Sequence, residues 1–271
     1  MGIGQGIGEL NVVPLSPHGF CAGVTAALRK AMSMRGVYCL HELVHNELVV
    51  AELLRRGFRF VSSVDDVPEG ETVLFSAHGV SPAVRTAAAA RRLKVVDATC
   101  PFVERVHRAA RAFAARGLDV VVLGNASHAE VCGIVGELGR AYVYPDLPPP
   151  GRRIGIVSQT TMNADEVDRL AASLGRRYEV ETAAEVCNAT KDRQDAVKAF
   201  RGDALLVLGS ATSSNTRRLA EVAPCRAFRA GTMDEVRSLP LAGIKTLGVT
   251  SGASTPESFF TEVVEWLHGR S

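Results

Sequence analysis

The sequence predicts an α/β fold built from three small α/β domains with mostly parallel sheets. A pattern of cysteine, helix-like segment, apolar strand and polar loop occurs three times, and strand-like segments alternate with helix-like ones along the chain. The cysteines that open the three copies, Cys21, Cys100 and Cys187, lie 79 and 87 residues apart. We therefore expect one domain per copy. The expected domains are 20–99, 100–186 and 187–271, with residues 1–19 associated with the third.

Each copy contains the same elements in the same order. After Cys100 come a helix-like segment (PFVERVHRAARAFAARG), a strand (LDVVVLG) and a polar loop (NASHAE). The third copy has NATKDRQDAVKAFRG, DALLVLG and SATSSN, and the first, more loosely, has AGVTAALRKAMSMRG, VYCL and HELVHN. The helices that follow the polar loops are expected at 46–56, 129–138 and 215–223. A further strand in each copy then ends in a second polar turn, in VLFSAHG, IGIVSQTT and TLGVTSGAS.

This organisation predicts where a site would lie. In parallel α/β units, ligands bind at the carboxyl ends of strands, where loops lead into helix N-termini. If the three domains meet around a pseudo-threefold axis, six polar loops and three cysteines converge on one central cavity. The proline-rich segment 144–151 lies inside the second copy and predicts a connection within that domain.

Composition excludes several classes of protein. The 271 residues are 46% hydrophobic and 22% charged, with a net charge of +2, as in ordinary globular proteins. Basic residues come in short pairs, so neither nucleic acid nor a membrane surface is an expected partner. No basic segment precedes an apolar one at the start, and no apolar stretch approaches the roughly 18 residues of a membrane span, so we expect a cytoplasmic protein. The start GIGQGIG lacks the spacing of a dinucleotide fingerprint, which disfavours a nicotinamide-dependent dehydrogenase.

The six cysteines fall into two groups. A cytoplasmic protein rarely uses disulfides, so a buried small hydrophobe is the default interpretation of each cysteine. Cys39 and Cys225 adjoin strand-like segments and fit it. Cys132 is expected in the core or in a cavity wall, with an extra metal ligand as the less favoured alternative. The other three cysteines are different, because each follows an extended segment and opens a helix.

Three thiols at helix starts suit a metal. A helix N-terminus favours the thiolate, which is the form that binds metal, and Pro101 supports a helix beginning directly after Cys100. A structural zinc site normally needs four ligands, often in CxxC pairs, and no CxxC occurs in the sequence. Three thiolates with a missing fourth ligand instead suit an iron–sulfur cluster with one accessible iron.

Nine short segments occur in register with a known family. The sequence contains, in order, GFCAG (19–23), HELVHN (41–46), SAHG (76–79), DATCP (97–101), HAEV (128–131), QTT (159–161), CNAT (187–190), SSN (213–215) and SGAS (251–254). Together they resemble the 4-hydroxy-3-methylbut-2-enyl diphosphate reductase family of isoprenoid biosynthesis, from about Pro17 to about Pro256.

The resemblance implies a fold, a cofactor and a reaction. The fold is a trefoil of three α/β domains around a central cavity. Cys21, Cys100 and Cys187 would hold a [4Fe–4S] cluster whose open iron site binds the allylic hydroxyl of the substrate. Two electrons and two protons remove that hydroxyl as water, giving isopentenyl and dimethylallyl diphosphate. The electrons would come from an external donor such as a ferredoxin or a flavodoxin.

The resemblance also implies roles for other side chains. Glu130 would deliver the proton, because a carboxyl group enclosed beside an anionic substrate should have a raised pKa; otherwise it is an exposed acid in the first turn of a helix. Thr160 would position Glu130 or the substrate, with Thr161 as its neighbour. Ser81 and Asn163 are expected only to cap helices. The diphosphate would bind, with His128 nearby, to His45, His78, Ser213, Ser214, Asn215 and Ser254.

Three departures from the family pattern keep alternatives open. His18 stands where the family usually has arginine, and HAEVCG replaces HPEVEG, which introduces Ala129 and Cys132. Loss of an arginine removes a permanent charge and a bidentate fork. One alternative is therefore a paralogous [4Fe–4S] reductase that acts on a different hydroxylated substrate. The other is a non-catalytic α/β protein that binds a phosphorylated metabolite and has lost the metal.

Overall fold

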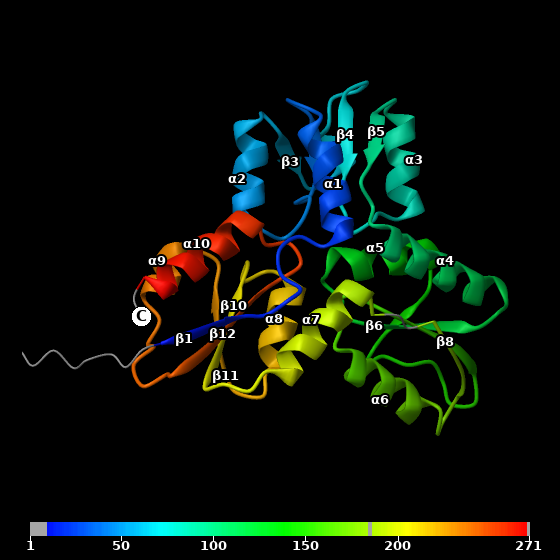
Figure 1. Cartoon of the computed structure of the whole chain (residues 1–271). Helices are drawn as coiled ribbons and strands as arrows, with labels where there is room; N and C mark the ends of the chain where they lie inside the picture. Colours follow the sequence, from blue (N-terminus) through cyan, green and yellow to red (C-terminus); the bar gives the residue numbers. More distant parts are fainter. Residues whose placement is uncertain (1–9, 184–185, 270–271) are drawn as a thin grey trace, which may run out of the picture. The chain divides into compact units, whose positions relative to one another are not determined.

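Three parallel sheets organise the chain. The structure, a computed structural model, describes residues 10–183 and 186–269 (Figure 1). The described part holds three four-stranded sheets, and the strand pairs within them are parallel. Helices alternate with the strands along the chain. The predicted α/β class with parallel sheets is confirmed.

The first sheet has the strand order β3-β2-β4-β5. Its strands are β2 (Tyr38–Leu40), β3 (Arg59–Val61), β4 (Thr72–Phe75) and β5 (Lys94–Asp97). The helices of this part of the chain are α1 (Ala22–Met32), α2 (Glu47–Arg55) and α3 (Pro82–Ala90), with a 3₁₀ turn at Val64–Asp66.

The second sheet has the order β7-β6-β8-β9. Its strands are β6 (Asp119–Leu123), β7 (Tyr142–Val143), β8 (Arg153–Ser158) and β9 (Glu179–Thr182). Its helices are α4 (Pro101–Ala115), α5 (Ala129–Leu138) and α6 (Ala164–Leu174). The proline-rich segment 144–151 joins β7 to β8, as predicted.

The third sheet has the order β1-β12-β10-β11. Its strands are β1 (Asn11–Pro14), β10 (Ala204–Leu208), β11 (Arg226–Ala230) and β12 (Thr246–Ser251). Its helices are α7 (Asn188–Ala199), α8 (Ser214–Glu221), α9 (Met233–Arg237) and α10 (Glu257–His268). The N-terminal strand β1, blue in Figure 1, thus lies beside a strand from the other end of the chain.

The three sheets repeat one topology. In the first two sheets, the first strand lies between the second and the third, and the fourth pairs with the third. Strands β10, β11 and β12 repeat the arrangement of the first three strands. In the third sheet β1 takes this fourth place. The fourth strands β5, β9 and β1 are the strands that precede Cys100, Cys187 and Cys21, so each cysteine lies where the chain leaves one sheet and enters the next.

Burial and local signals explain the elements. The strand β10 (ALLVL) is buried along its whole length, as expected for a parallel strand covered on both faces. Helix α4 has a proline at its first position, which favours a helix start. It buries Val103, Val106, Ala110 and Phe113, whose spacing of three and four residues forms one apolar stripe. It packs against β8 and α5.

The chain divides into two compact units. The first unit comprises the described residues up to Cys21, His45–Leu48, and those from Asn188 on; the second comprises Ala22–Val44 and Val49–Cys187. The boundaries expected from the sequence, 20–99, 100–186 and 187–271, stay a prediction. Within the described residues, no helix has the length and apolar character that a membrane span requires.

Candidate active site

Glu130 is a buried carboxyl group in the second unit. It lies in the first turn of α5, is 2% exposed, and accepts hydrogen bonds from the backbone N–H of Thr160 at 2.7 Å and from the Thr160 hydroxyl at 3.1 Å. Burial raises the pKa of this carboxyl to about 7, although both hydrogen bonds from Thr160 act in the opposite direction. Glu130 is therefore not the exposed first-turn acid of the alternative interpretation, and it can hold a proton near neutral pH.

Adjacent parallel strands bring Glu130 and Thr160 together. Strand β6 leads to α5 and β8 leads to Thr160, and the two strands are neighbours in register, so their carboxyl ends meet. Gln159 joins the two loops: its N–H donates to the Leu123 carbonyl, and its side-chain oxygen accepts from the N–H of Asn125. Gln159 was not predicted as a site residue, although it is the first residue of the QTT segment.

The Thr160 loop also contacts a predicted metal ligand. The backbone N–H of Cys187 donates to the Thr160 carbonyl at 3.2 Å, and α7 begins at the next residue. Thr160 thus holds the Glu130 carboxyl with its N–H and hydroxyl, and the backbone of Cys187 with its carbonyl. Thr160 therefore bonds both to the predicted acid and to the backbone of one predicted metal ligand.

Two predicted substrate ligands lie together in the second unit. His128 caps α5, its Nδ1 accepting from the N–H of Glu130 at 3.2 Å. Its ring meets that of His78 edge to face, with ring centroids 5.4 Å apart. His78 follows β4 in the SAHG loop, where Ser76 Oγ lies 3.3 Å from its Nδ1. These imidazoles and the buried acid therefore come from neighbouring loops.

The turn before Cys100 is held by an aspartate. The Asp97 carboxylate accepts from the N–H and hydroxyl of Thr99 and, at 2.6 Å, from Arg85. Burial works against ionisation of Asp97, but these hydrogen bonds outweigh it and keep its pKa below its usual range. The N–H of Cys100 then donates to the Ala77 carbonyl at 3.0 Å, which joins the Cys100 turn to the SAHG loop.

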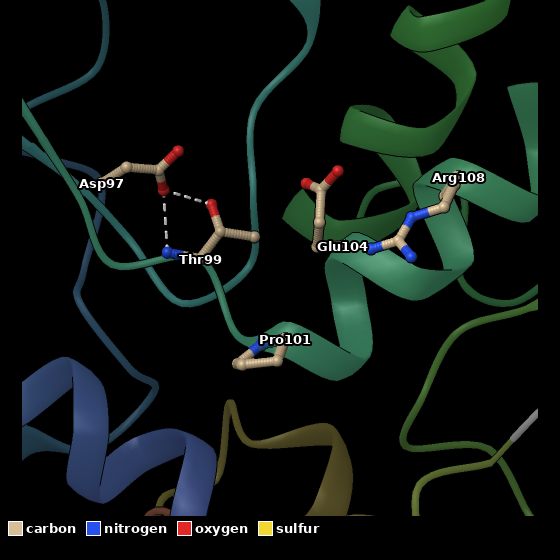
Figure 2. A pocket seen from close by; sticks show the side chains of 5 residues that line it. All are labelled: Asp97, Thr99, Pro101, Glu104 and Arg108. Carbon is tan, nitrogen blue, oxygen red and sulfur yellow. Dashed lines mark hydrogen bonds between the residues drawn. The ribbon is translucent and has the colours of Figure 1, made fainter.

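An open pocket of about 360 Å³ lies beside this turn. It is lined by Asp97, Thr99, Pro101, Glu104 and Arg108 (Figure 2). None of these five residues was predicted as a ligand. Since Asp97 is already engaged by Thr99 and Arg85, its carboxylate serves the turn that carries Cys100.

The remaining predicted ligands lie in the first unit. Ser213 caps α8, and Ser214 and Asn215 begin that helix; all three are buried. Ser254 is also buried, and its hydroxyl donates to the His45 carbonyl at 3.0 Å. Cys21 lies directly before α1, and its N–H donates to the carbonyl of Ala253 at 3.0 Å. The SGAS loop thus contacts both the Cys21 turn and the His45 segment.

The three predicted cluster ligands share the same local setting. Cys21, Cys100 and Cys187 are half-buried thiols, and each directly precedes a helix, as predicted. Burial raises the pKa of the Cys39 thiol to about 12, and burial with the nearby Asp203 raises that of Cys225, so both disfavour the thiolate that a metal needs. Cys21, Cys100 and Cys187 therefore stay the predicted ligands, and Cys39 and Cys225 are less suited to bind a metal.

Cys132 was expected in the core or in a cavity wall, and the core position is wrong. Its side chain is exposed, and its thiol lies 3.4 Å from the Ala126 carbonyl. Residues two apart on a helix point about 200° apart, so when α5 buries Glu130 it turns Cys132 outward. The helical period together with a buried Glu130 predicts this exposure.

Two predicted caps are present, and two further histidines have structural contacts. Ser81 caps α3 and Asn163 caps α6, as expected. His107 is a buried structural residue, with Nδ1 2.9 Å from the Glu137 carboxylate. His18 stacks on Phe260 with ring centroids 3.9 Å apart.

Removing the Thr160 hydroxyl should strengthen proton binding by Glu130. In Thr160→Val the backbone N–H remains, but the hydroxyl hydrogen bond that lowers the pKa is lost. We expect Glu130 to hold its proton about tenfold more tightly, the equivalent of one hydrogen bond of about 1.4 kcal/mol. Carboxyl ¹³C NMR of labelled glutamate measures this. Thr161→Val is the control, because the Thr161 hydroxyl accepts from Gln159 instead, and equal titration in both variants would contradict the expectation.

These features define an α/β protein of three parallel sheets, with thiols before three helices and a buried acid that binds a proton near pH 7. A family model described as LytB protein matches residues 12–268 of the chain. The chain belongs to the LytB family, a family of iron–sulfur enzymes.

Relatives and a solved structure are similar over nearly the whole chain. The chain is 42% identical to a 4-hydroxy-3-methylbut-2-enyl diphosphate reductase of Acidothermus cellulolyticus, over 96% of this chain and 83% of the relative. It is 40% identical to the reductase of the same name from Magnetococcus marinus, over 96% and 92%. The structure of E-1-hydroxy-2-methyl-but-2-enyl-4-diphosphate reductase from Plasmodium falciparum is similar with a TM-score of 0.88 and 28% identity, over 95% of this chain and 88% of that one.

Proposed function

We propose that this chain is a 4-hydroxy-3-methylbut-2-enyl diphosphate reductase, which removes the allylic hydroxyl of its substrate as water to give isopentenyl and dimethylallyl diphosphate. Membership of the LytB family and the names of its relatives support this function. The observation that carries it is the buried Glu130, hydrogen-bonded to Thr160, whose carbonyl accepts from the backbone of Cys187. The proposed acid and the backbone of a proposed metal ligand both form hydrogen bonds with Thr160.

The proposed cofactor is a [4Fe–4S] cluster held by Cys21, Cys100 and Cys187. When bound, such a cluster supplies electrons and one iron that lacks a protein ligand. Three half-buried thiols at helix starts are the support from this chain, since the partial positive charge of a helix N-terminus stabilises thiolates. The electrons that the reaction consumes would come from a small external carrier, such as a ferredoxin or a flavodoxin.

Glu130 is the proposed proton donor. Its pKa of about 7 leaves a large fraction protonated at neutral pH, which suits a general acid. The N–H and hydroxyl of Thr160 fix both carboxyl oxygens, so the proton is presented from a constant position. After the proton leaves, the same two hydrogen bonds stabilise the carboxylate that remains.

The proposed diphosphate ligands are histidines, hydroxyls and an amide. His78 and His128 lie together in the second unit. The other proposed ligands belong to the first unit: His45, Ser213, Ser214, Asn215 and Ser254. A doubly charged diphosphate needs many donors, and each hydrogen bond to a charged group contributes about 1.5–3 kcal/mol. Helix α8 adds N-terminal amides behind Ser213.

An anaerobic assay tests this function. The purified, reconstituted chain is mixed with 4-hydroxy-3-methylbut-2-enyl diphosphate and a reduced viologen dye, and dye oxidation and both products are measured. We expect substrate-dependent oxidation with formation of the two diphosphates. A full cluster spectrum without turnover would favour the paralogous reductase with another substrate. A chain that binds no stoichiometric iron and sulfide would contradict both enzymes and favour the metabolite-binding protein.

A further inference from the structure

A buried arginine joins two of the cysteine segments. Arg193 lies on α7, six residues after Cys187, and is 2% exposed. Its Nη1 donates to the Ala189 carbonyl at 2.8 Å, in the first turn of the same helix. Its Nη2 donates to the Gly19 carbonyl at 2.8 Å and lies 3.4 Å from that of His18. One guanidinium therefore holds the start of the helix after Cys187 and the turn before Cys21.

The turn before Cys21 is shaped for this contact. Gly19 has a φ of +69°, a conformation that favours glycine, and a Cβ there would meet the Glu257 carboxylate. Its N–H donates to the Ser251 hydroxyl at 2.8 Å, while its carbonyl accepts from Arg193. Two residues later, the N–H of Cys21 donates to the carbonyl of Ala253. The backbone in front of the thiol is thus fixed by α7 and by the SGAS loop.

Further hydrogen bonds close a ring around this turn. The N–H of Ala253 donates to the side-chain oxygen of Asn215 at 3.4 Å, and the Asn215 amide donates to the Thr190 hydroxyl at 3.2 Å. Thr190 lies on α7, less than one turn before Arg193. The chain of contacts therefore runs from α7 through Asn215 and the SGAS loop to Cys21 and returns to α7 through Arg193. Asn215, a predicted diphosphate ligand, is part of this ring.

We propose that Arg193 is a positioning residue of the metal centre, which fixes the Cys21 turn against the helix that follows Cys187 and places a permanent positive charge beside them. The inference rests on the proposed function. Burying a cation is costly, and a carbonyl clamp alone does not require a charge. A positive charge near the cluster favours the reduced state, because reduction adds negative charge. Arg193 therefore has two separable effects, one of its fork and one of its charge.

Three variants separate these effects. Arg193→Lys keeps the charge but loses the planar fork that reaches several carbonyls, and Arg193→Met loses both. Lys191→Met is the matched control, because it removes an exposed cation from the same helix two residues away. Two properties of the anaerobically reconstituted protein are measured without substrate: the rate at which a chelator removes iron, and the midpoint potential by electron paramagnetic resonance.

We expect both Arg193 variants to lose iron to the chelator about 10–100-fold faster, the usual effect of removing support behind a metal ligand. Only Arg193→Met should show a lower midpoint potential, while Lys191→Met resembles the parent in both. Arg193→Met and Lys191→Met with equal potentials and equal iron loss would overturn the inference. If Arg193→Met does not fold by circular dichroism, Arg193→Lys decides, and iron loss at the parent rate overturns it.

Failure of the inference and failure of the proposed function give different results. A parent that binds the cluster but does not reduce the diphosphate, with variants that differ as expected, contradicts the substrate and keeps the role of Arg193. Normal turnover by the parent, with Arg193 variants like the control, contradicts only the role of Arg193. A parent that binds no iron overturns both.

Discussion

Glu130→Gln is expected to fold like the parent and to lose turnover by about 10²–10⁴-fold, the usual contribution of a general acid. The amide keeps both contacts of the carboxyl: its oxygen accepts from the N–H of Thr160, and its nitrogen can donate to the hydroxyl, which then accepts. What the variant lacks is a proton to transfer. The anaerobic dye assay gives the rate, and equal iron content excludes loss of the cluster.

Glu166→Gln is the matched control for this variant. Glu166 also lies in the first turn of a helix, α6, so its neutralisation changes the helix dipole interaction in the same way. We expect full turnover. Equal turnover in Glu130→Gln and the parent would remove the acid role, and equal losses in both variants would assign the effect to helix stability.

The pKa of Glu130 also predicts how stability changes with pH. Because burial raises it from 4.5 to about 7, the folded chain binds one more proton than the unfolded chain between these values. The contribution of Glu130 to the stability of the folded chain is therefore most favourable below about pH 4.5. It decreases as the pH rises to about 7, by about 3 kcal/mol in total. Glu130→Gln lacks this contribution. The difference in unfolding free energy between variant and parent, from urea titrations, should grow in favour of the variant from pH 5 to pH 7.5.

Local signals explain what the sequence could predict. The helix starts after Cys21, Cys100 and Cys187 were predicted because each follows an extended segment and, for α4, because a proline stands at the first helical position. These signals are properties of neighbouring residues. The parallel class follows from the alternation of strands and helices. The burial of Glu130 was expected only through the family resemblance, since a first-turn glutamate has the same local pattern whether exposed or buried.

Long-range contacts explain what the sequence could not predict. The pairing of Asn11 with Thr246 places β1 in the third sheet. The four residues of β1 do not predict which strand they pair with. The contact between Arg193 and Gly19 spans 174 residues, and a buried arginine has the same sequence pattern as a solvated one. Cys132 is the opposite case, because its place two residues after Glu130 on one helix predicts its exposure once Glu130 is taken as buried.

Replacing a ligand thiol should abolish both cofactor binding and turnover. Serine is a hard oxygen donor that stays protonated near neutral pH, so Cys100→Ser or Cys187→Ser leaves the cluster with a vacant, poorly matched position. The backbone N–H of Cys100 donates a hydrogen bond to Ala77, and that of Cys187 donates one to Thr160. The substitutions therefore keep the loops in place and change only the atom that binds the metal. We expect iron and sulfide per chain to fall severalfold and turnover to fall at least about 10²-fold, more than the 10–100-fold typical of residues behind a ligand.

Cys132→Ser is the decisive comparison for these variants. Its thiol is exposed on the side of α5 away from Glu130, so the cluster and the rate should remain those of the parent. If Cys132→Ser loses iron as Cys100→Ser does, the centre has a fourth thiol and no iron is left for the substrate hydroxyl. If Cys100→Ser retains full iron and full turnover, the assignment of the cysteines by their place at helix starts is wrong. Because the three variants differ in only one atom from the parent, iron content measured alongside turnover separates a lost ligand from a misfolded chain.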